Sequence, residues 1–118
     1  MIDAPKGIKL VMREVGDVMV VDLAGKLMSA ESVEWVFEMV VETITNLRPF
    51  FNKVVFNFAE LSKMSDTAVN KLGEMEKGAE FKLRVCCVRR LGSNTQTKLV
   101  FQLRENPAEN EFEAVKNI

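Results

Sequence analysis

Apolar and polar positions alternate along the first part of the chain, as a half-buried strand requires. This alternation covers residues 8–15, and a dense β-branched run follows at residues 18–23. The intervening Gly16-Asp17 is a typical turn sequence. The two segments are therefore predicted to form a β-hairpin.

The spacing of apolar residues then changes from two to three and four. Ser29 is expected to be a helix N-cap, and the new spacing continues from Val33 as far as Leu47. Pro49 stops the pattern. This segment is predicted to be an amphipathic helix that ends near Arg48.

Residues 53–58 are almost continuously apolar, which is typical of a central parallel strand buried on both faces. The remaining elements are expected to be a loop at 59–65, a helix capped by Ser65 or Asp66 and closed by Gly78, a strand at 81–88, a helix at 95–104 and a helical tail at 112–118. The residues expected to point inward from the last two elements are Leu99, Val100, Leu103, Phe112 and Val115.

The element order is β-β-α-β-α-β-α followed by a terminal segment. Strands that alternate with helices predict an α/β fold with a parallel or mixed sheet and right-handed crossovers. A chain of 118 residues suits one domain, expected to span residues 1–118 and to bury one proper core.

Charge and composition narrow the class of partners. The chain carries 16 basic and 17 acidic residues, a net charge of -1, so no strong field favours nucleic acid or an anionic membrane. Residues 1–7 contain Asp3 and Pro5 and lack the apolar core of a secretory signal. No apolar run approaches the roughly 20 residues of a membrane helix. We therefore expect a cytoplasmic protein that binds neither nucleic acid nor membrane.

The inventory of catalytic and metal-ligating groups is thin. The chain has no histidine and no tyrosine, which removes Ser-His and Cys-His pairs and a phenolic acid. Cys86 and Cys87 are neighbours on a predicted strand, where their side chains would point to opposite faces and could not bridge. No glycine-rich phosphate loop or zinc-ligand set is present. The sequence predicts a binding protein with no catalytic residues, metal or cofactor.

Trp35 lies one step off the main apolar stripe of the predicted long helix. Under the favoured interpretation, it covers the edge of the core. Under the other, it contacts a partner or a second copy of the chain, because aromatic residues are enriched at binding hot spots. A homodimer is left open.

Three stretches of the chain together resemble a known family, and the similarity extends over nearly the whole chain from about Ile8. In residues 18–27, VMVVDLAGKL, a strand leads through a Gly-x-Leu step towards a helix. Residues 53–68, KVVFNFAELSKMSDTA, join a buried strand to a leucine-containing loop and a helix start. Residues 83–88, LRVCCV, and Leu99-Val100-Phe101 form a later strand and helix. Together they resemble the STAS family, which is shared by bacterial anti-sigma factor antagonists and the tails of sulfate transporters.

The resemblance implies a mixed sheet of four or five strands with helices mainly on one face. It also implies a bacterial regulator of transcription. In the anti-sigma factor antagonists, the turn into the second helix reads Asp-Ser-Ser-Gly, and its first serine is phosphorylated by a kinase that is itself the anti-sigma factor. The dephosphorylated antagonist binds that kinase and releases the sigma factor.

This chain departs from the family pattern at that turn, which reads Ser65-Asp66-Thr67-Ala68. Asp66 stands at the phosphoacceptor position. Under one interpretation, Asp66 is a helix N-cap that stabilises the protein by about 0.5–2 kcal/mol. Under the other, it also supplies a permanent charge of about -1 at the partner surface, against roughly -1.5 to -2 for a phosphoserine. Any phosphorylation is predicted on Ser65 or Thr67.

The resemblance places the partner surface around this turn and the exposed face of the second helix. The expected partner is an anti-sigma factor of the serine-kinase type. The residues expected to contact it are Lys63, Ser65, Asp66, Thr67, Asn70, Lys71 and Glu74.

Two other classes stay open. The first is a STAS subunit of a stressosome-like or transporter assembly. The second is a small nucleotide-binding protein. Calorimetry that detects nucleotide binding in the micromolar range would favour this class.

Overall fold

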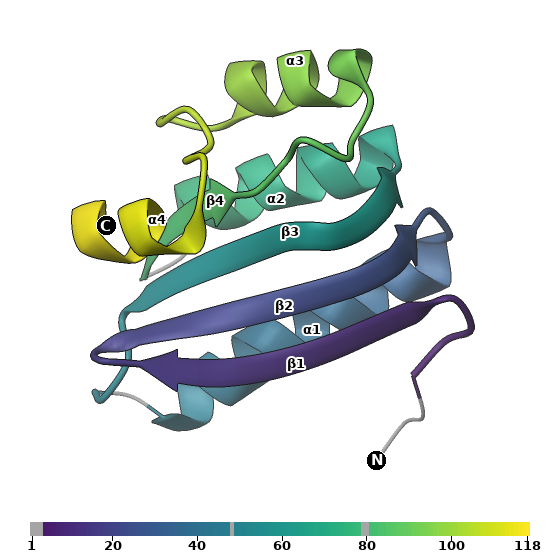
Figure 1. Cartoon of the computed structure of the whole chain (residues 1–118). Coiled ribbons are helices and arrows are strands. Elements are labelled where there is room, and N and C mark those ends of the chain that lie inside the picture. Colours follow the sequence, from purple (N-terminus) through teal and green to yellow (C-terminus); the bar gives the residue numbers. More distant parts are fainter. Residues whose placement is uncertain (1–3, 48, 79–80) are drawn as a thin grey trace.

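The computed structural model describes residues 4–47, 49–78 and 81–118. Within these residues, four strands form one mixed sheet in the order β1-β2-β3-β4 (Figure 1). The strands are β1 Ile8–Val15, β2 Val18–Leu27, β3 Lys53–Met64 and β4 Lys82–Cys86. The β1–β2 hairpin is antiparallel, and the β2–β3 and β3–β4 pairs are parallel.

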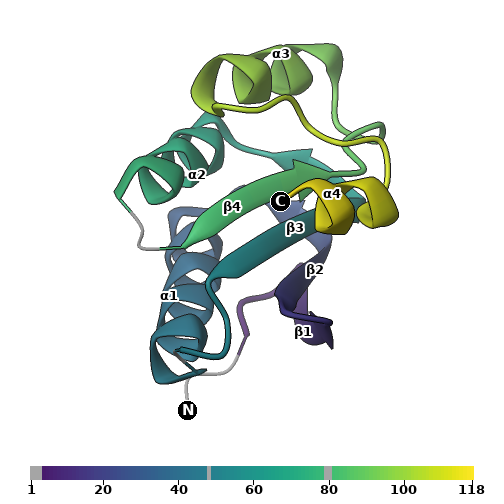
Figure 2. The same cartoon turned by 90° about the vertical axis from the view of Figure 1, so that its left-hand side faces the viewer.

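The helices cover the two faces of the sheet unequally. They are α1 Ala30–Leu47, α2 Asp66–Gly78, α3 Ser93–Gln102 and α4 Glu111–Asn117. Helices α1 and α2 lie on one face with α3 beside α2, while α4 lies on the other face (Figure 2). None of these helices combines the length and apolar character needed to cross a membrane. The predicted α/β fold, a mixed sheet with helices mainly on one face, is confirmed.

The main core lies between the sheet and helices α1 and α2. Buried side chains of β2 and β3 enter it, and the Phe56 ring lies 6.0 Å from that of Phe37 on α1, measured between centroids. Trp35 is half-buried and packs against this core, so its predicted position at the core edge is confirmed. The Ser29 hydroxyl accepts a hydrogen bond from the Ser32 amide (3.0 Å), which confirms the predicted cap of α1.

A second, smaller core lies between the sheet and α4. Its buried residues are Val18, Val20, Val55, Cys86, Ala108 and Ala114. Strands β2 and β3 are therefore buried on both faces, as the continuous apolar run at 53–58 predicts. Val115 of α4 is half-buried against this core, as expected.

Strand β4 is shorter than predicted, because the chain turns after Cys86. Cys87 has a φ of 62°, a left-handed conformation that cannot continue a strand. Its amide donates to the carbonyl of Ala108 (3.1 Å), which forms a β-bridge with Cys86 at the outer edge of β4. Both cysteines are free, as predicted, but both contact the second core, so the prediction of opposite faces is wrong.

Strand β3 continues to Met64, so the predicted loop at 59–65 is wrong. Its register against β2 shifts twice, between Asp22 and Ala24 and between Gly25 and Lys26. Each shift inserts an extra residue into β3, which is a β-bulge. Pairing with this bulged strand also carries β2 beyond its predicted end, as far as Leu27.

Two residues predicted to point inward are exposed. Val100 on α3 is 48% exposed, and Phe112 on α4 is 74% exposed. Leu99 already occupies the inward position on α3, and the next residue lies about 100° further around the helix. Phe112 lies on the outer side of α4, where the Lys116 ammonium is 6.0 Å from its ring centroid.

Candidate partner-binding site at the start of helix α2

The end of strand β3 fixes the position of the first residue of α2. Met64 is buried in the main core, and the Ser65 amide donates to the carbonyl of Leu27 at the end of β2 (2.9 Å). The Ser65 hydroxyl accepts from the Ala68 amide (3.1 Å). Ser65 is therefore the N-cap, and the interpretation of Asp66 as the cap is wrong.

Asp66 is the first residue of the helix and points away from the core. Its side chain is 71% exposed, and its Oδ1 lies 2.6 Å from the Lys98 ammonium of α3. Because Lys98 is itself 48% exposed, the pair contributes at most about 1 kcal/mol to stability. The carboxylate is also favourable beside the positive end of the helix dipole. The result is an accessible carboxylate with an ammonium group beside it.

The other residues of the turn differ in accessibility. Lys63 and Thr67 are exposed, whereas Ser65 is half-buried. Since the Ser65 hydroxyl is held by the helix cap, Thr67 is the more accessible of the two hydroxyl groups.

Helix α3 lies along one side of α2, a contact that the sequence did not predict. The Gln102 amide nitrogen donates to the side-chain oxygen of Asn70 (3.2 Å). A Cβ atom added to Gly73 would lie 3.2 Å from the Cβ of Gln102, so the absence of a side chain there allows the helices to approach closely. Asn70 therefore lies at the α2–α3 contact, and Lys98 and Gln102 join the residues expected at the site.

Lys71 and Glu74 lie elsewhere on α2. Both are exposed, and both line a groove between α2 and α1. The seven residues predicted from the sequence thus divide among the strand–helix turn, the α3 side of α2 and the α1 side of α2. At the turn around Asp66, the ends of β2 and β3 come together with Lys98 of α3.

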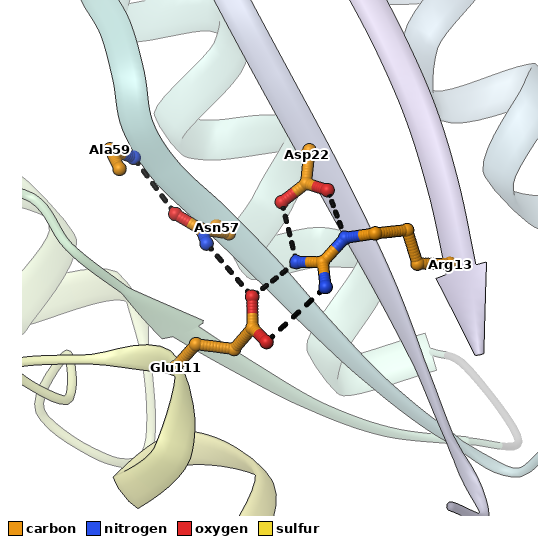
Figure 3. Close-up of polar contacts among 5 residues, drawn as sticks. All are labelled: Arg13, Asp22, Asn57, Ala59 and Glu111. Carbon is orange, nitrogen blue, oxygen red and sulfur yellow. Dashed lines mark hydrogen bonds and ion pairs between the residues drawn. The ribbon is translucent and has the colours of Figure 1, made fainter. Parts of the chain in front are cut away.

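A second polar cluster occupies the α4 face of the sheet (Figure 3). Arg13 on β1 makes paired hydrogen bonds to Asp22 on β2 and reaches Glu111 at the start of α4. The side-chain nitrogen of Asn57 also donates to Glu111 (3.1 Å), while its oxygen accepts from the Ala59 amide (2.9 Å). Ala59 lies at the first bulge of β3, where the regular ladder is interrupted. The cluster therefore joins three strands to α4.

The charges within this cluster support one another. The hydrogen bond from Arg13 is the main cause that lowers the pKa of Glu111 below its usual range. The bonds to Asp22 and Glu111 raise the pKa of Arg13 further above its ordinary value. Arg13 and Glu111 are thus held in their charged forms at neutral pH, as expected for a cluster that fixes the position of a helix.

The described residues hold no group of three or more His, Cys, Asp or Glu side chains placed to bind a metal ion. Burial is the main cause that raises the pKa of the Cys86 thiol well above its ordinary value. Cys86 is therefore a protonated, inert thiol at neutral pH. The site around Asp66 presents an exposed carboxylate beside the ammonium group of Lys98.

Comparison with known proteins identifies the fold. No protein-family model matches the sequence, and no curated protein matches it. Solved structures do match. An anti-sigma factor antagonist from Mycobacterium paratuberculosis has a TM-score of 0.70 at 14% identity, over 98% of this chain and 97% of that chain. The anti-sigma factor antagonist SpoIIAA in its unphosphorylated form has a TM-score of 0.62 at 24% identity, over 93% of this chain and 100% of that chain.

A third match is an uncharacterised protein from Shewanella loihica, described as having a SpoIIAA-like fold. Its TM-score is 0.54 at 17% identity, over 98% of this chain and 97% of that chain. The protein is thus an α/β protein with one mixed sheet and a helix start exposed at the end of a central strand. More particularly, it has a SpoIIAA-like fold.

Proposed function

We propose that this protein is an anti-sigma factor antagonist, a regulatory module that binds an anti-sigma factor of the serine-kinase type in the bacterial cytoplasm. Residues 1–118 act as one STAS-like domain, without catalysis. The partner contacts the turn from Lys63 to Thr67 and the adjoining part of α2. Two of the matching solved structures are antagonists of this class, which supports the proposal.

The observation that carries the proposal is the position of Asp66. It stands where the resemblance places the phosphoacceptor serine, at the first residue of a helix that follows a central strand, with a side chain that is 71% exposed. A partner that recognises this helix start would contact its carboxylate and the neighbouring Lys98. Recognition would then depend on charge at this position.

Reversing the charge of Asp66 tests the proposal. The intact chain serves as bait in an affinity capture from the source organism, and mass spectrometry quantifies the captured proteins. We expect a kinase-type anti-sigma factor to be recovered. Asp66→Lys is expected to reduce the recovery of this kinase at least about tenfold. The substitution removes the carboxylate that the partner is proposed to contact and introduces an ammonium group that repels Lys98.

Asp17→Lys is the matched control. Asp17 is also an exposed aspartate paired with a lysine, its carboxylate lying 3.1 Å from the Lys53 ammonium, but at the opposite end of the sheet. Its substitution changes the net charge equally and is expected to leave recovery unchanged. Failure to recover any such kinase with the unaltered chain, or equal losses from both substitutions, would contradict the proposal.

Phosphorylation forms a separate prediction for this site. With the recovered kinase and ATP, phosphate is expected on Thr67 or Ser65, with Thr67 preferred because it is exposed and the Ser65 hydroxyl is engaged in the helix cap. Phosphopeptide mapping by mass spectrometry measures the position. Phosphate on neither residue would remove regulation by phosphorylation at this turn.

A further inference from the structure

A groove of about 830 Å³ runs between helices α1 and α2. It lies on the side of α2 that faces away from α3, so it is distinct from the turn around Asp66. Its lining includes Val41 of α1 and Met75 of α2, which are 43% exposed and half-buried, respectively. The lining also includes Phe37 and Phe81, which belong to the main core. The groove therefore has an apolar floor that a partner can reach.

The rim of this groove is strongly acidic. Glu34, Glu38 and Glu42 recur at every fourth position of α1, which places them along one line about 12 Å long. Glu74 faces them from α2, and among the described residues of the lining Lys71 is the single basic one. All four glutamates are exposed, and none belongs to an ion pair among the described residues.

Repulsion along such a line of glutamates is tolerated at some cost to helix stability. Like charges four residues apart in a helix are unfavourable by roughly 0.2–0.5 kcal/mol per pair. A ligand with positive charge on both sides of an apolar stripe would relieve this repulsion and bury Val41 and Met75 together. The charges and the apolar floor together thus specify the chemistry of the occupant.

We propose that the groove between α1 and α2 binds a basic amphipathic helix of a partner protein. Its apolar side packs on Val41 and Met75, and its lysine or arginine side chains pair with the glutamates of the rim. Helix-in-groove binding of this kind is a recurrent mode of peptide recognition. The proposal concerns a surface other than the turn around Asp66, and it holds for any partner that carries such a helix.

A designed peptide provides the first test. The probe is a leucine–lysine peptide of about 15 residues with leucines at spacings of three and four, and its leucine–glutamate counterpart is the negative control. With the intact, isotope-labelled chain, the lysine peptide is expected to shift the amide resonances of α1 and α2 that line the groove. Binding should weaken as salt increases. Shifts centred elsewhere, or equal binding of the glutamate peptide, would overturn the proposal.

Charge reversal on α1 provides the second test. The triple substitution Glu34→Lys, Glu38→Lys and Glu42→Lys is expected to weaken binding of the lysine peptide at least about tenfold by calorimetry. The matched control reverses three exposed glutamates outside the groove, Glu14→Lys, Glu109→Lys and Glu113→Lys, and should change affinity less than about twofold. Circular dichroism verifies that both variants are folded.

Equal weakening by the two triple variants would mean attraction to net charge alone and would overturn the proposal. Self-association of the unaltered chain that the α1 substitutions abolish would also overturn it, since the occupant would then be a second copy. Neither result bears on the capture experiment at Asp66, so a failure of the groove and a failure of the antagonist function are distinguishable.

Discussion

Replacing Gly25 by alanine is expected to lower the free energy of unfolding by about 2–5 kcal/mol. Gly25 has a φ of 99°, a conformation that side-chain-bearing residues rarely adopt. A Cβ atom added there would lie 2.0 Å from the carbonyl oxygen of Gly7. That oxygen belongs to the backbone and already accepts a hydrogen bond from the Lys26 amide (2.8 Å). No side-chain rotation can relieve the clash, so the backbone at Gly7 must move away from β2.

Two other glycines separate the causes of this effect. Gly16 has a φ of 61° but no atom near its added Cβ, so Gly16→Ala should cost only about 1–2 kcal/mol. Gly78, at the end of α2, has neither feature, and Gly78→Ala should be neutral or slightly stabilising. Urea denaturation followed by circular dichroism measures all three. Equal costs for Gly25→Ala and Gly16→Ala would show that the close approach to Gly7 is unimportant.

The structural effect of Gly25→Ala should extend to the candidate site. The carbonyl of Gly25 accepts from the Ser62 hydroxyl (3.0 Å), and that of Leu27 accepts from the Ser65 amide (2.9 Å). These two contacts join the end of β2 to the bulged end of β3 and so determine where α2 begins. A change in the Ser65 and Asp66 amide resonances is therefore expected in the Gly25→Ala protein.

The parts of the fold that the sequence predicts are those in which burial follows a regular period. Helix α1 was predicted almost to the residue, because its buried positions recur at three and four and it has a local cap at Ser29. The β1–β2 hairpin follows from its period of two. The start of β3 follows from a continuous apolar run of strand length that is rich in β-branched and aromatic residues.

The second half of β3 shows where periodicity fails. Phe58, Leu61 and Met64 are all buried in the main core, at spacings of three. An uninterrupted strand would point alternate residues to the same face, but the two bulges add one residue each and restore the core-facing orientation after three. A spacing of three in a short segment with polar residues between is not a recognisable strand pattern. The prediction of a loop was therefore wrong.

The candidate site likewise has features that the sequence predicts and contacts that it does not. The cap by Ser65 and the exposure of Asp66 are local properties of a helix start, which the sequence brings within reach. The ion pair between Asp66 and Lys98 joins residues 32 positions apart, and the bond between Gln102 and Asn70 spans the same separation. Both depend on the packing of α3 beside α2, and no pattern in one chain specifies which side of a helix its neighbour will occupy. The same holds for Arg13 and Glu111, which are 98 positions apart.

Replacing Arg13 by methionine is expected to destabilise the protein by about 1–3 kcal/mol at pH 7, and much less at pH 3. The side chains of Asp22 and Glu111 are 32% and 29% exposed, so their carboxylates would face each other with limited access to water. Breaking a fully buried ion pair costs about 3–5 kcal/mol. The smaller figure expected here allows for Arg13, whose side chain is 40% exposed.

The pH dependence follows from the pKa of Glu111, which hydrogen bonding to Arg13 lowers in the folded state. The pKa of an unfolded glutamate is about 4.3. The stabilisation is therefore fully present above that pH and is lost as the pH falls through the lower folded-state pKa. At pH 3 protonation weakens the interaction in the unaltered protein and relieves the repulsion in the variant, so their stabilities should converge.

Lys53→Met is the control for this prediction, because it removes an exposed ion pair. Its partner is Asp17, whose side chain is 69% exposed. Solvent screens that pair, so its loss should change stability far less than the loss of Arg13. Urea denaturation at pH 7 and pH 3 gives the stabilities, and hydrogen exchange shows whether the amides of α4 open first in the Arg13→Met protein. Since Glu111 begins α4, faster exchange confined to α4 would identify the cluster as a contact that, with the second core, holds this helix on the sheet. A cost for Arg13→Met that is the same at both pH values, or no larger than that of Lys53→Met, would show that the cluster has no such role.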